Sequence, residues 1–346
     1  EMNRYIFMYR VRKITGRLNL TRMQQFLKYI LNFRKDYYHD CHTSADVKNP
    51  TVVFCIDGKT IHGGLSDRLR GLFSIYSYCL SREKQLVINW IYPFRLSDYL
   101  EINKEVRNVK WGGYLSHNKK EVAFRFFNSY SSMDDQERSY FKLLDTDKAI
   151  THVYSNVTLH EELYSKYFNE LFTPSIHLQN SIEKCLSEIG GNYVSITFRF
   201  IGLLGDFKDP FTAVPRLTEE QKKDYIDHGL KAIKQVHELH RNTIKKILVT
   251  ADSNLFLSKA VEVFPFAYAI PGKVVHMDAE SGKSYKLHER EFLDFFMISK
   301  AQESYTYQYG KMFGATRFAR TAALVDGRKI KEITDNGLLT GAFAQN

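Results

Sequence analysis

Four segments of the sequence are rich in hydroxyl, guanidinium or carboxylate side chains, three of them with glycines, and each lies at the end of a run typical of a β-strand. They are residues 62–70, 197–209, 250–254 and 310–320. In a parallel α/β sheet, ligands bind where the carboxyl ends of the strands turn into helices. Guanidinium groups and the backbone N–H groups at helix starts bind anions, so these segments predict a site for a phosphate-bearing ligand.

The first segment, "HGGLSDRLR", places two glycines before the start of a predicted helix. Gly63 and Gly64 let the backbone approach a ligand closely and leave N–H groups exposed. The segment is neither GxGxxG nor a P-loop, because no Gly-Lys-Ser/Thr follows. Taken alone, it is equally compatible with a tight turn in which Asp67 satisfies the first helical turn.

Arg199 lies at the end of the apolar run "ITFRF", where an unpaired guanidinium would be costly to bury. Its partner is either a carboxylate of the same domain or a phosphate. We favour phosphate because the guanidinium fork binds it bidentately and because a glycine-bearing loop follows.

Two acids follow or interrupt apolar runs. Asp252 comes after "ILVT", where an N-cap or Asx turn is the strong alternative to ligand binding. Asp294 lies within the aromatic run "FLDFF" and needs a specific donor there. A guanine edge, a ribose hydroxyl or an arginine would supply one.

Strand-like and helix-like runs alternate over most of the chain. "TVVFCI", a helical run from Leu65 and "LVINWIY" form a predicted βαβ unit. Beyond Gly190 the alternation returns through residue 325, which predicts a second doubly wound sheet. Residues 93–172 contain short strand-like pieces such as "VKWGGYLS" and "VAFRFFNSY", for which we make no sharp prediction.

The formal net charge of +10 over 346 residues points to an anionic partner: nucleic acid, a membrane surface or a phosphorylated small molecule. Much of the excess lies before residue 48, where residues 21–34 predict a basic amphipathic helix. We favour packing on the first domain over insertion at a membrane interface. With no nucleic-acid module recognised, we expect no nucleic acid as a partner.

The four cysteines are scattered without metal-ligand spacing, so we expect reduced thiols and no metal site. No run reaches the roughly 18 apolar residues of a membrane span. We therefore expect a cytoplasmic protein, with peripheral contact at the inner membrane face as the alternative.

Taken together, the motifs resemble those of the fucosyltransferase superfamily, which includes bacterial α-1,2- and α-1,6-fucosyltransferases and protein O-fucosyltransferases. The resemblance covers residues 51 to about 325. It rests on four segments in the family's order: "GGLSDRLRGLFSIYSYC", "ITFRF" with "GDF", "VTADS", and "FLDFFMISKAQESYTYQYGKMFGATRFARTAAL".

The resemblance implies an α/β GT-B fold, in which two Rossmann-like domains face a cleft. We expect a basic helical segment over residues 1–48, an acceptor-side domain over 49–178 and a nucleotide-sugar-binding domain over 179–346. The implied activity is inverting transfer of fucose from GDP-fucose to an oligosaccharide or glycolipid hydroxyl in bacterial surface polysaccharide synthesis, with no required metal. A different nucleotide sugar, or a non-catalytic role in binding nucleic acid or another polyanion, stays open.

The resemblance also implies roles for individual residues. Arg199 would neutralise the donor β-phosphate, and Asp294 would read guanine. The residues expected to bind the nucleotide sugar beside Asp294 are Gly63, Gly64, Arg68, Thr197, Asp252, Thr316 and Phe318. The chain departs from the family at Thr197, which replaces the motif histidine, and at Ser253, which replaces a second acid.

Deprotonation of the acceptor hydroxyl calls for a general base. His62 and Asp206 are the favoured candidates, and Asp67 and Asp209 are the alternatives. In the first loop we expect Arg68 to point into the cleft and Arg70 to be structural.

Overall fold

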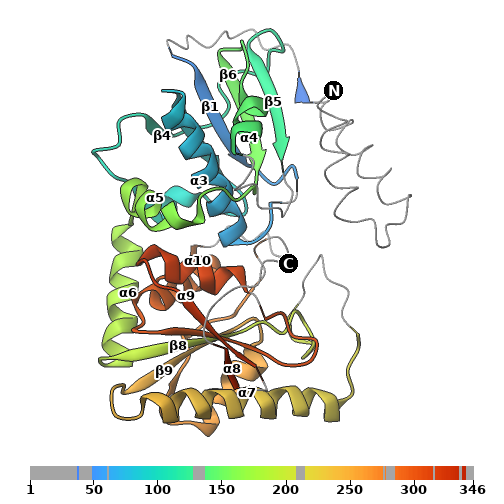
Figure 1. Cartoon of the computed structure of the whole chain (residues 1–346), viewed down its shortest axis with the longest axis vertical. Coiled ribbons are helices and arrows are strands. Elements are labelled where there is room, and N and C mark those ends of the chain that lie inside the picture. Colours follow the sequence, from blue (N-terminus) through green and yellow to red (C-terminus); the bar gives the residue numbers. More distant parts are fainter. Residues whose placement is uncertain are drawn as a thin grey trace.

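The structure is a computed structural model of the chain (Figure 1). It describes residues 37–38, 49–60, 62–127, 137–207, 215–275, 277, 285–314, 316–334 and 337–339. The predicted basic helix over residues 21–34 lies outside these ranges. So do Cys41 and Asp209.

The first sheet holds five strands within the described residues, in the order β4-β2-β1-β6-β5, and all of its pairings are parallel. Its strands are β1 (Thr51–Ile56), β2 (Gln85–Trp90), β4 (Val109–Trp111), β5 (Val122–Phe127) and β6 (Ile150–Ser155). Every residue of β1 is buried, as expected for a central parallel strand covered on both faces.

Helix α3 (Leu65–Ser81) joins β1 to β2 and completes the predicted βαβ unit. Gly71 lets this helix lie against the end of β6, because a Cβ there would collide with the carbonyl oxygen of Ser155. The beginning of α3 is thereby held close to the carboxyl ends of the strands.

The second sheet holds six strands within the described residues, in the order β10-β9-β8-β11-β12-β13. They are β8 (Tyr193–Phe198), β9 (Lys246–Ala251), β10 (Ala267–Tyr268), β11 (Ser304–Gln308), β12 (Ile330–Thr334) and β13 (Gly337–Leu339). All pairings are parallel except that of β12 with β13. The alternation predicted beyond Gly190 is therefore confirmed as a second parallel sheet.

The helices of this half follow the predicted rhythm. They are α7 (Glu219–His240), α8 (Asn254–Val263), α9 (Tyr285–Lys300) and α10 (Arg317–Val325). Thr218 and Gln221 form a capping box at the start of α7, and Ser253 caps α8 by accepting from the Phe256 N–H.

The middle of the chain adds three strands, β4, β5 and β6, to the first sheet and supplies the connection between the halves. The connecting elements are a 3₁₀ turn η1 (Leu96–Asp98), β3 (Leu100–Ile102), α4 (Glu137–Leu144), a 3₁₀ turn η3 (Glu161–Leu163), α5 (Tyr164–Leu171), β7 (Phe172–Pro174) and α6 (Ile176–Ile189). Helix α6 runs along one side of the molecule from the upper half to the lower (Figure 1). The boundary that we predict between residues 178 and 179 falls inside this helix.

The two halves pack directly against each other. Tyr99 stacks with Tyr285 and Phe292, with ring centroids 4.5 and 4.3 Å apart, and its hydroxyl donates to the Tyr285 carbonyl oxygen at 2.5 Å. Ser165 and Asn169 of α5 both donate to the carbonyl oxygen of Val325 at the end of α10, each at 2.9 Å. These contacts hold the strand ends of one sheet in a defined position opposite those of the other.

Cys55, Cys79 and Cys185 are buried free thiols, as expected. Among the helices that the structure describes, none has the length and apolar character needed to cross a membrane.

Candidate functional site

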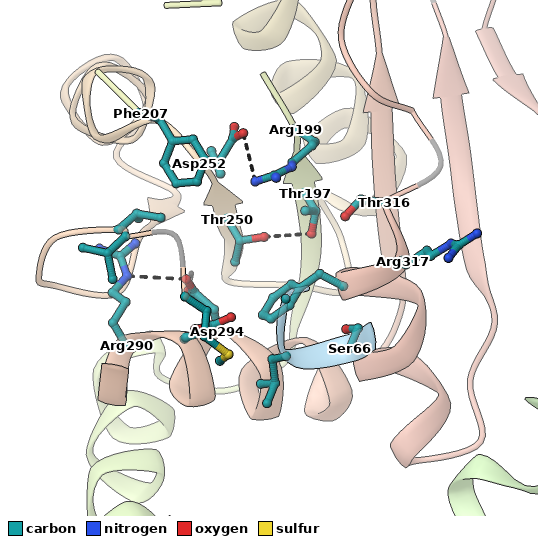
Figure 2. A pocket seen from close by; sticks show the side chains of 18 of the residues that line it. Ser66, Thr197, Arg199, Phe207, Thr250, Asp252, Arg290, Asp294, Thr316 and Arg317 are labelled. Carbon is teal, nitrogen blue, oxygen red and sulfur yellow. Dashed lines mark hydrogen bonds and ion pairs between the residues drawn. The ribbon is translucent and has the colours of Figure 1, made fainter. Parts of the chain in front are cut away.

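A cavity of about 490 Å³ lies between the two halves, at the carboxyl ends of β1, β8 and β9 (Figure 2). The first half contributes residues 63–67, from the loop after β1 and the first turn of α3. The second half contributes residues 197–199, 250–252, 273–275 and 316–318, together with Leu287, Arg290, Glu291 and Asp294, among others. The four sequence segments therefore do meet at one place.

Arg199 stands at one end of the cavity, just after β8. Its Nη1 lies 3.1 Å from Oδ2 of Asp252, and its guanidinium lies over the Phe207 ring at 5.2 Å. The Arg199 side chain is 26% exposed and lines the cavity. The carboxylate partner that we considered is thus present, and it holds the guanidinium where a ligand can reach it.

Asp252 is a structural anchor as well as a lining residue. Its Oδ1 accepts from the Phe200 N–H and its Oδ2 from the Ile201 N–H, both at 2.7 Å. Burial raises the pKa of this carboxyl, while Arg199 and the backbone N–H groups act in the opposite direction. The N-cap role that the sequence suggested for Asp252 belongs to Ser253.

Hydroxyl groups line the middle of the cavity. The Oγ1 atoms of Thr197 and Thr250 lie 2.7 Å apart, so these two hydroxyls are bonded to each other. Thr316 is the N-cap residue of α10 and makes no side-chain cap hydrogen bond, and Phe318 lies beside it in the lining. The N-terminus of α10 therefore faces the cavity, where its dipole favours an anion.

Arg290 and Asp294 form a second pair at another end of the cavity, one turn apart on α9 (Figure 2). Arg290 Nε lies 3.5 Å from Asp294 Oδ2, and Arg290 Nη1 donates to the Gly272 carbonyl oxygen. Burial raises the pKa of Asp294 to about 6, although Arg290 acts to lower it. An arginine was one of the partners that we considered for Asp294, without naming the residue, and the spacing of four residues from Arg290 was the available signal.

The first loop requires a correction. Gly63 and Gly64 line the cavity, with Gly63 at φ +80°, but Arg68 does not point into the cleft. Its side chain is completely buried, with Nε donating to the Gly63 carbonyl oxygen at 2.8 Å and Nη1 to that of Tyr92 at 2.6 Å. Arg68 therefore stabilises the loop through hydrogen bonds to two carbonyl oxygens and is not part of the cavity lining.

The two favoured candidates for the base also lie outside the lining. His62 is buried, and its Nε2 accepts from the Gly58 N–H at 3.2 Å. Asp206 Oδ2 accepts from the Leu255 N–H at 2.7 Å and from Ser253 Oγ at 3.1 Å, at the start of α8. Both side chains hold local structure, which leaves their proposed proton transfer without geometric support.

Asp67 is the alternative carboxylate that does line the cavity. Its Oδ1 lies 3.0 Å from Arg70 Nη2 in the same helix and 3.7 Å from Arg317 Nη1 of the other half. Arg70 is therefore structural, as predicted. The pair of Asp67 with Arg317 links the two halves at the cavity wall.

Sequence reasoning also missed Ser66, Phe313 and Arg317, as well as lining residues outside the four segments, among them Lys273, Leu287, Arg290 and Glu291. Ser66 lies in the first turn of α3, and within the described residues its buried hydroxyl has no hydrogen-bond partner. Phe313 is a half-exposed aromatic ring at the cavity, with its N–H donating to the Arg199 carbonyl oxygen at 3.0 Å. No group of three or more metal-ligating side chains occurs in the part of the chain that the structure describes.

The structure of this chain, but not its sequence, matches known proteins. Neither a protein-family model nor a curated protein matches the sequence. Among solved structures, fucosyltransferase NodZ from Bradyrhizobium is similar at a TM-score of 0.54 and 17% identity, over 84% of this chain and 98% of that one. The chain has the GT-B fold. A NodZ α-1,6-fucosyltransferase co-crystallized with GDP gives a TM-score of 0.54 at 18% identity, again over 84% and 98% of the two chains.

The expected α/β GT-B fold, with two Rossmann-like halves facing a cleft, is thus confirmed. The resemblance to the fucosyltransferase superfamily is confirmed at the level of the fold. At these identities the comparison speaks for the fold alone, so the chemistry of the cavity has to be argued from its own residues.

Proposed function

We propose that the protein is a glycosyltransferase that transfers fucose from GDP-fucose to a hydroxyl group of an oligosaccharide or glycolipid. The observation that carries the proposal is the cavity itself, which has Arg199 and the N-terminus of α10 on its walls and a buried Arg290–Asp294 pair beyond them. A nucleoside diphosphate sugar needs a site for its phosphates and a site for its nucleobase within one cleft. Both are offered here by the second half of the chain.

In the proposed reaction, the acceptor oxygen forms a bond to the anomeric carbon while the bond from that carbon to the β-phosphate oxygen breaks. The electron pair leaves with GDP, and Arg199 stabilises the negative charge that develops there. Attack from the face opposite the leaving group inverts the anomeric centre. The acceptor proton passes to a base, for which Asp67 is the carboxylate that the first half presents to the cavity.

The test is release of GDP from GDP-fucose in the presence of oligosaccharide and glycolipid acceptors. We expect Arg199→Ala to lower turnover about 100-fold or more, because a preorganised donor to the leaving group is lost. Arg199→Lys keeps the charge without the fork and should fall in between. Arg82→Ala is the matched control, since Arg82 forms an exposed ion pair with Asp145 on the surface. Turnover of Arg199→Ala within a few-fold of wild type would overturn the proposal.

A different nucleotide sugar is the second candidate donor. Where the resemblance implies a histidine, the chain has Thr197, whose hydroxyl is bonded to Thr250. Thermal shift with GDP, UDP, ADP and CMP separates the two candidates. A clear preference for GDP supports GDP-fucose, and a preference for another nucleotide supports the second.

The finer biological role is also part of the proposal. We propose that the enzyme acts in bacterial surface polysaccharide synthesis in the cytoplasm. Peripheral contact of residues 1–48 with the membrane is the alternative to their packing on the first domain. The net charge of +10 agrees with anionic substrates and an anionic surface. No metal is assigned a role, because Arg199 supplies a cation for the diphosphate. Sedimentation with vesicles containing anionic lipid, with and without residues 1–48, tests the membrane contact, and equal sedimentation of the two would contradict it.

A further inference from the structure

The Arg290–Asp294 pair is incomplete. Each residue is only 6% exposed, and both line the cavity. Arg290 Nη1 is bonded to the Gly272 carbonyl oxygen, but Nη2 has no hydrogen-bond partner among the described residues. Asp294 Oδ1 likewise lacks a partner there, while Oδ2 faces Arg290 Nε at 3.5 Å.

Buried polar atoms without partners are rare in folded proteins, because desolvation of the group is then uncompensated. One remaining donor and one remaining acceptor belong to neighbouring side chains on the same helix face. This arrangement calls for a ligand that offers an acceptor beside a donor.

The walls around the pair are largely apolar. Val274, Val275, Met277 and Leu287 line this part of the cavity, and the lining also includes the charged residues Lys273 and Glu291. Such walls suit the faces of a flat heterocycle, while a few polar groups fix its edge. The ligand group is therefore a planar ring that carries adjacent acceptor and donor atoms.

Among nucleobases, a carbonyl oxygen next to a ring N–H occurs in guanine and uracil. Adenine and cytosine present the reverse order at the same edge, with an amino donor beside a ring nitrogen acceptor. Guanine has a second donor, its exocyclic amino group, next to the ring N–H, and the buried carboxylate of Asp294 can accept from it as well. Guanine thus satisfies the pair most fully.

We infer that Arg290 is a specificity-determining residue: its Nη2 donates to O6 of a guanine base whose N1–H is bonded to Asp294 Oδ1. The inference rests on the proposed function, because the base belongs to the donor nucleotide. It deepens that proposal by naming a residue to which the resemblance assigns no role. Selectivity for the base carbonyl then comes from α9.

The test is isothermal titration calorimetry with nucleotides that alter single atoms of the base. 6-Thio-GDP replaces only O6 by sulfur, a weak acceptor, and the diphosphate of 2,6-diaminopurine riboside reverses the donor and acceptor order. For wild type we expect about tenfold weaker binding of 6-thio-GDP, and about 100-fold or more weaker binding of the diaminopurine nucleotide, because its edge sets an amino donor against Arg290 Nη2 and a ring-nitrogen acceptor against Asp294 Oδ1.

Arg290→Met keeps much of the packing volume and removes the donors. In this variant we expect GDP and 6-thio-GDP to bind within about twofold of each other, since the atom that distinguishes them has lost its contact. Arg199→Lys is the control: it should weaken both nucleotides by the same factor, because it acts on the phosphates that they share.

Two results would overturn the inference while the proposed function stands. One is wild type that binds GDP and the diaminopurine nucleotide equally, which needs no variant to fold. The other is a folded Arg290→Met variant that keeps the wild-type ratio of GDP to 6-thio-GDP affinity. Wild type that binds none of the nucleotides would instead overturn the proposed function and, with it, this inference.

Discussion

The cavity contains two arginine–aspartate pairs that differ in how fully their polar atoms are satisfied. In the Arg199–Asp252 pair, the carboxylate accepts two backbone N–H groups at 2.7 Å and contacts the guanidinium at 3.1 Å. In the Arg290–Asp294 pair, the separation is 3.5 Å and each residue keeps a buried atom without a partner among the described residues.

The difference indicates that contacts within the protein satisfy the Arg199–Asp252 pair, whereas the Arg290–Asp294 pair has hydrogen-bonding atoms available to a ligand. The Asp252 carboxylate accepts from two backbone N–H groups and balances the charge of Arg199. The Arg199 guanidinium stays partly exposed to the cavity. Among the described residues, no backbone N–H donates to the carboxylate of the pair on α9, and its ionised form is destabilised by burial. One pair is an anchor that presents a cation, and the other is an open set of hydrogen-bonding groups.

The largest effect that we expect is the loss of stability when the Arg199–Asp252 pair is removed. Asp252→Ala leaves the Phe200 and Ile201 N–H groups and the Arg199 guanidinium without their acceptor. We expect a loss of about 3–5 kcal/mol in the free energy of unfolding, as for other broken buried pairs. Urea denaturation followed by circular dichroism measures it.

Glu262→Ala is the control for that measurement, because Glu262 pairs with Lys259 at the exposed surface. Its expected cost is below about 1 kcal/mol. Equal losses for Asp252→Ala and Glu262→Ala would mean that Asp252 is not the anchor that its hydrogen bonds suggest.

The same pair marks where sequence reasoning stops. The strand "ILVT" and the acid after it were readable, but Asp252 reaches across to the end of the neighbouring strand β8. That contact depends on the register of two strands about 50 positions apart in the chain, which local spacing does not encode. Likewise, "VKWGGYLS" and "VAFRFFNSY" suggested strands, but not their order within the first sheet.

Other features were within reach of the sequence. Arg290 precedes Asp294 by one helical turn, so the pair follows from spacing alone. Arg68 lies on the same helix face as Leu65 and Leu72, which are buried, and periodicity could have placed it inside the fold instead of in the cleft. The fold class was predictable because alternation of strands and helices is a local signal.

A second prediction concerns GDP binding and pH. With the pKa of Asp294 at about 6, its carboxylate is ionised and can accept from the base above pH 6, and it becomes protonated below that pH. We expect GDP affinity to fall by about fivefold between pH 6 and pH 5 through this group. The terminal phosphate of the nucleotide titrates in the same range. Asp294→Asn carries only the phosphate effect, so a profile identical to wild type would contradict the role of Asp294.

The same carboxyl acts on stability with the opposite sign. Its folded pKa of about 6 lies above the ordinary value of 3.8, so its contribution is fully present below 3.8 and is lost as pH rises through 6. On going from pH 7 to pH 5, the free energy of unfolding should rise by about 1.4 kcal/mol more in wild type than in Asp294→Asn. Urea midpoints at the two pH values test this, and parallel changes in both proteins would place the titration elsewhere.

The smallest effect sharpens the description of the first pair. Phe207 lies under the Arg199 guanidinium at 5.2 Å, beside the carboxylate contact. Phe207→Leu removes the aromatic face but keeps an apolar side chain, so we expect a loss of about 0.5–1 kcal/mol in the free energy of unfolding. If Asp252 is the main hold on Arg199, GDP affinity should change less than about threefold in this variant. A larger drop, measured by calorimetry at fixed salt, would mean that the ring, as well as the carboxylate, aims Arg199 at the phosphate.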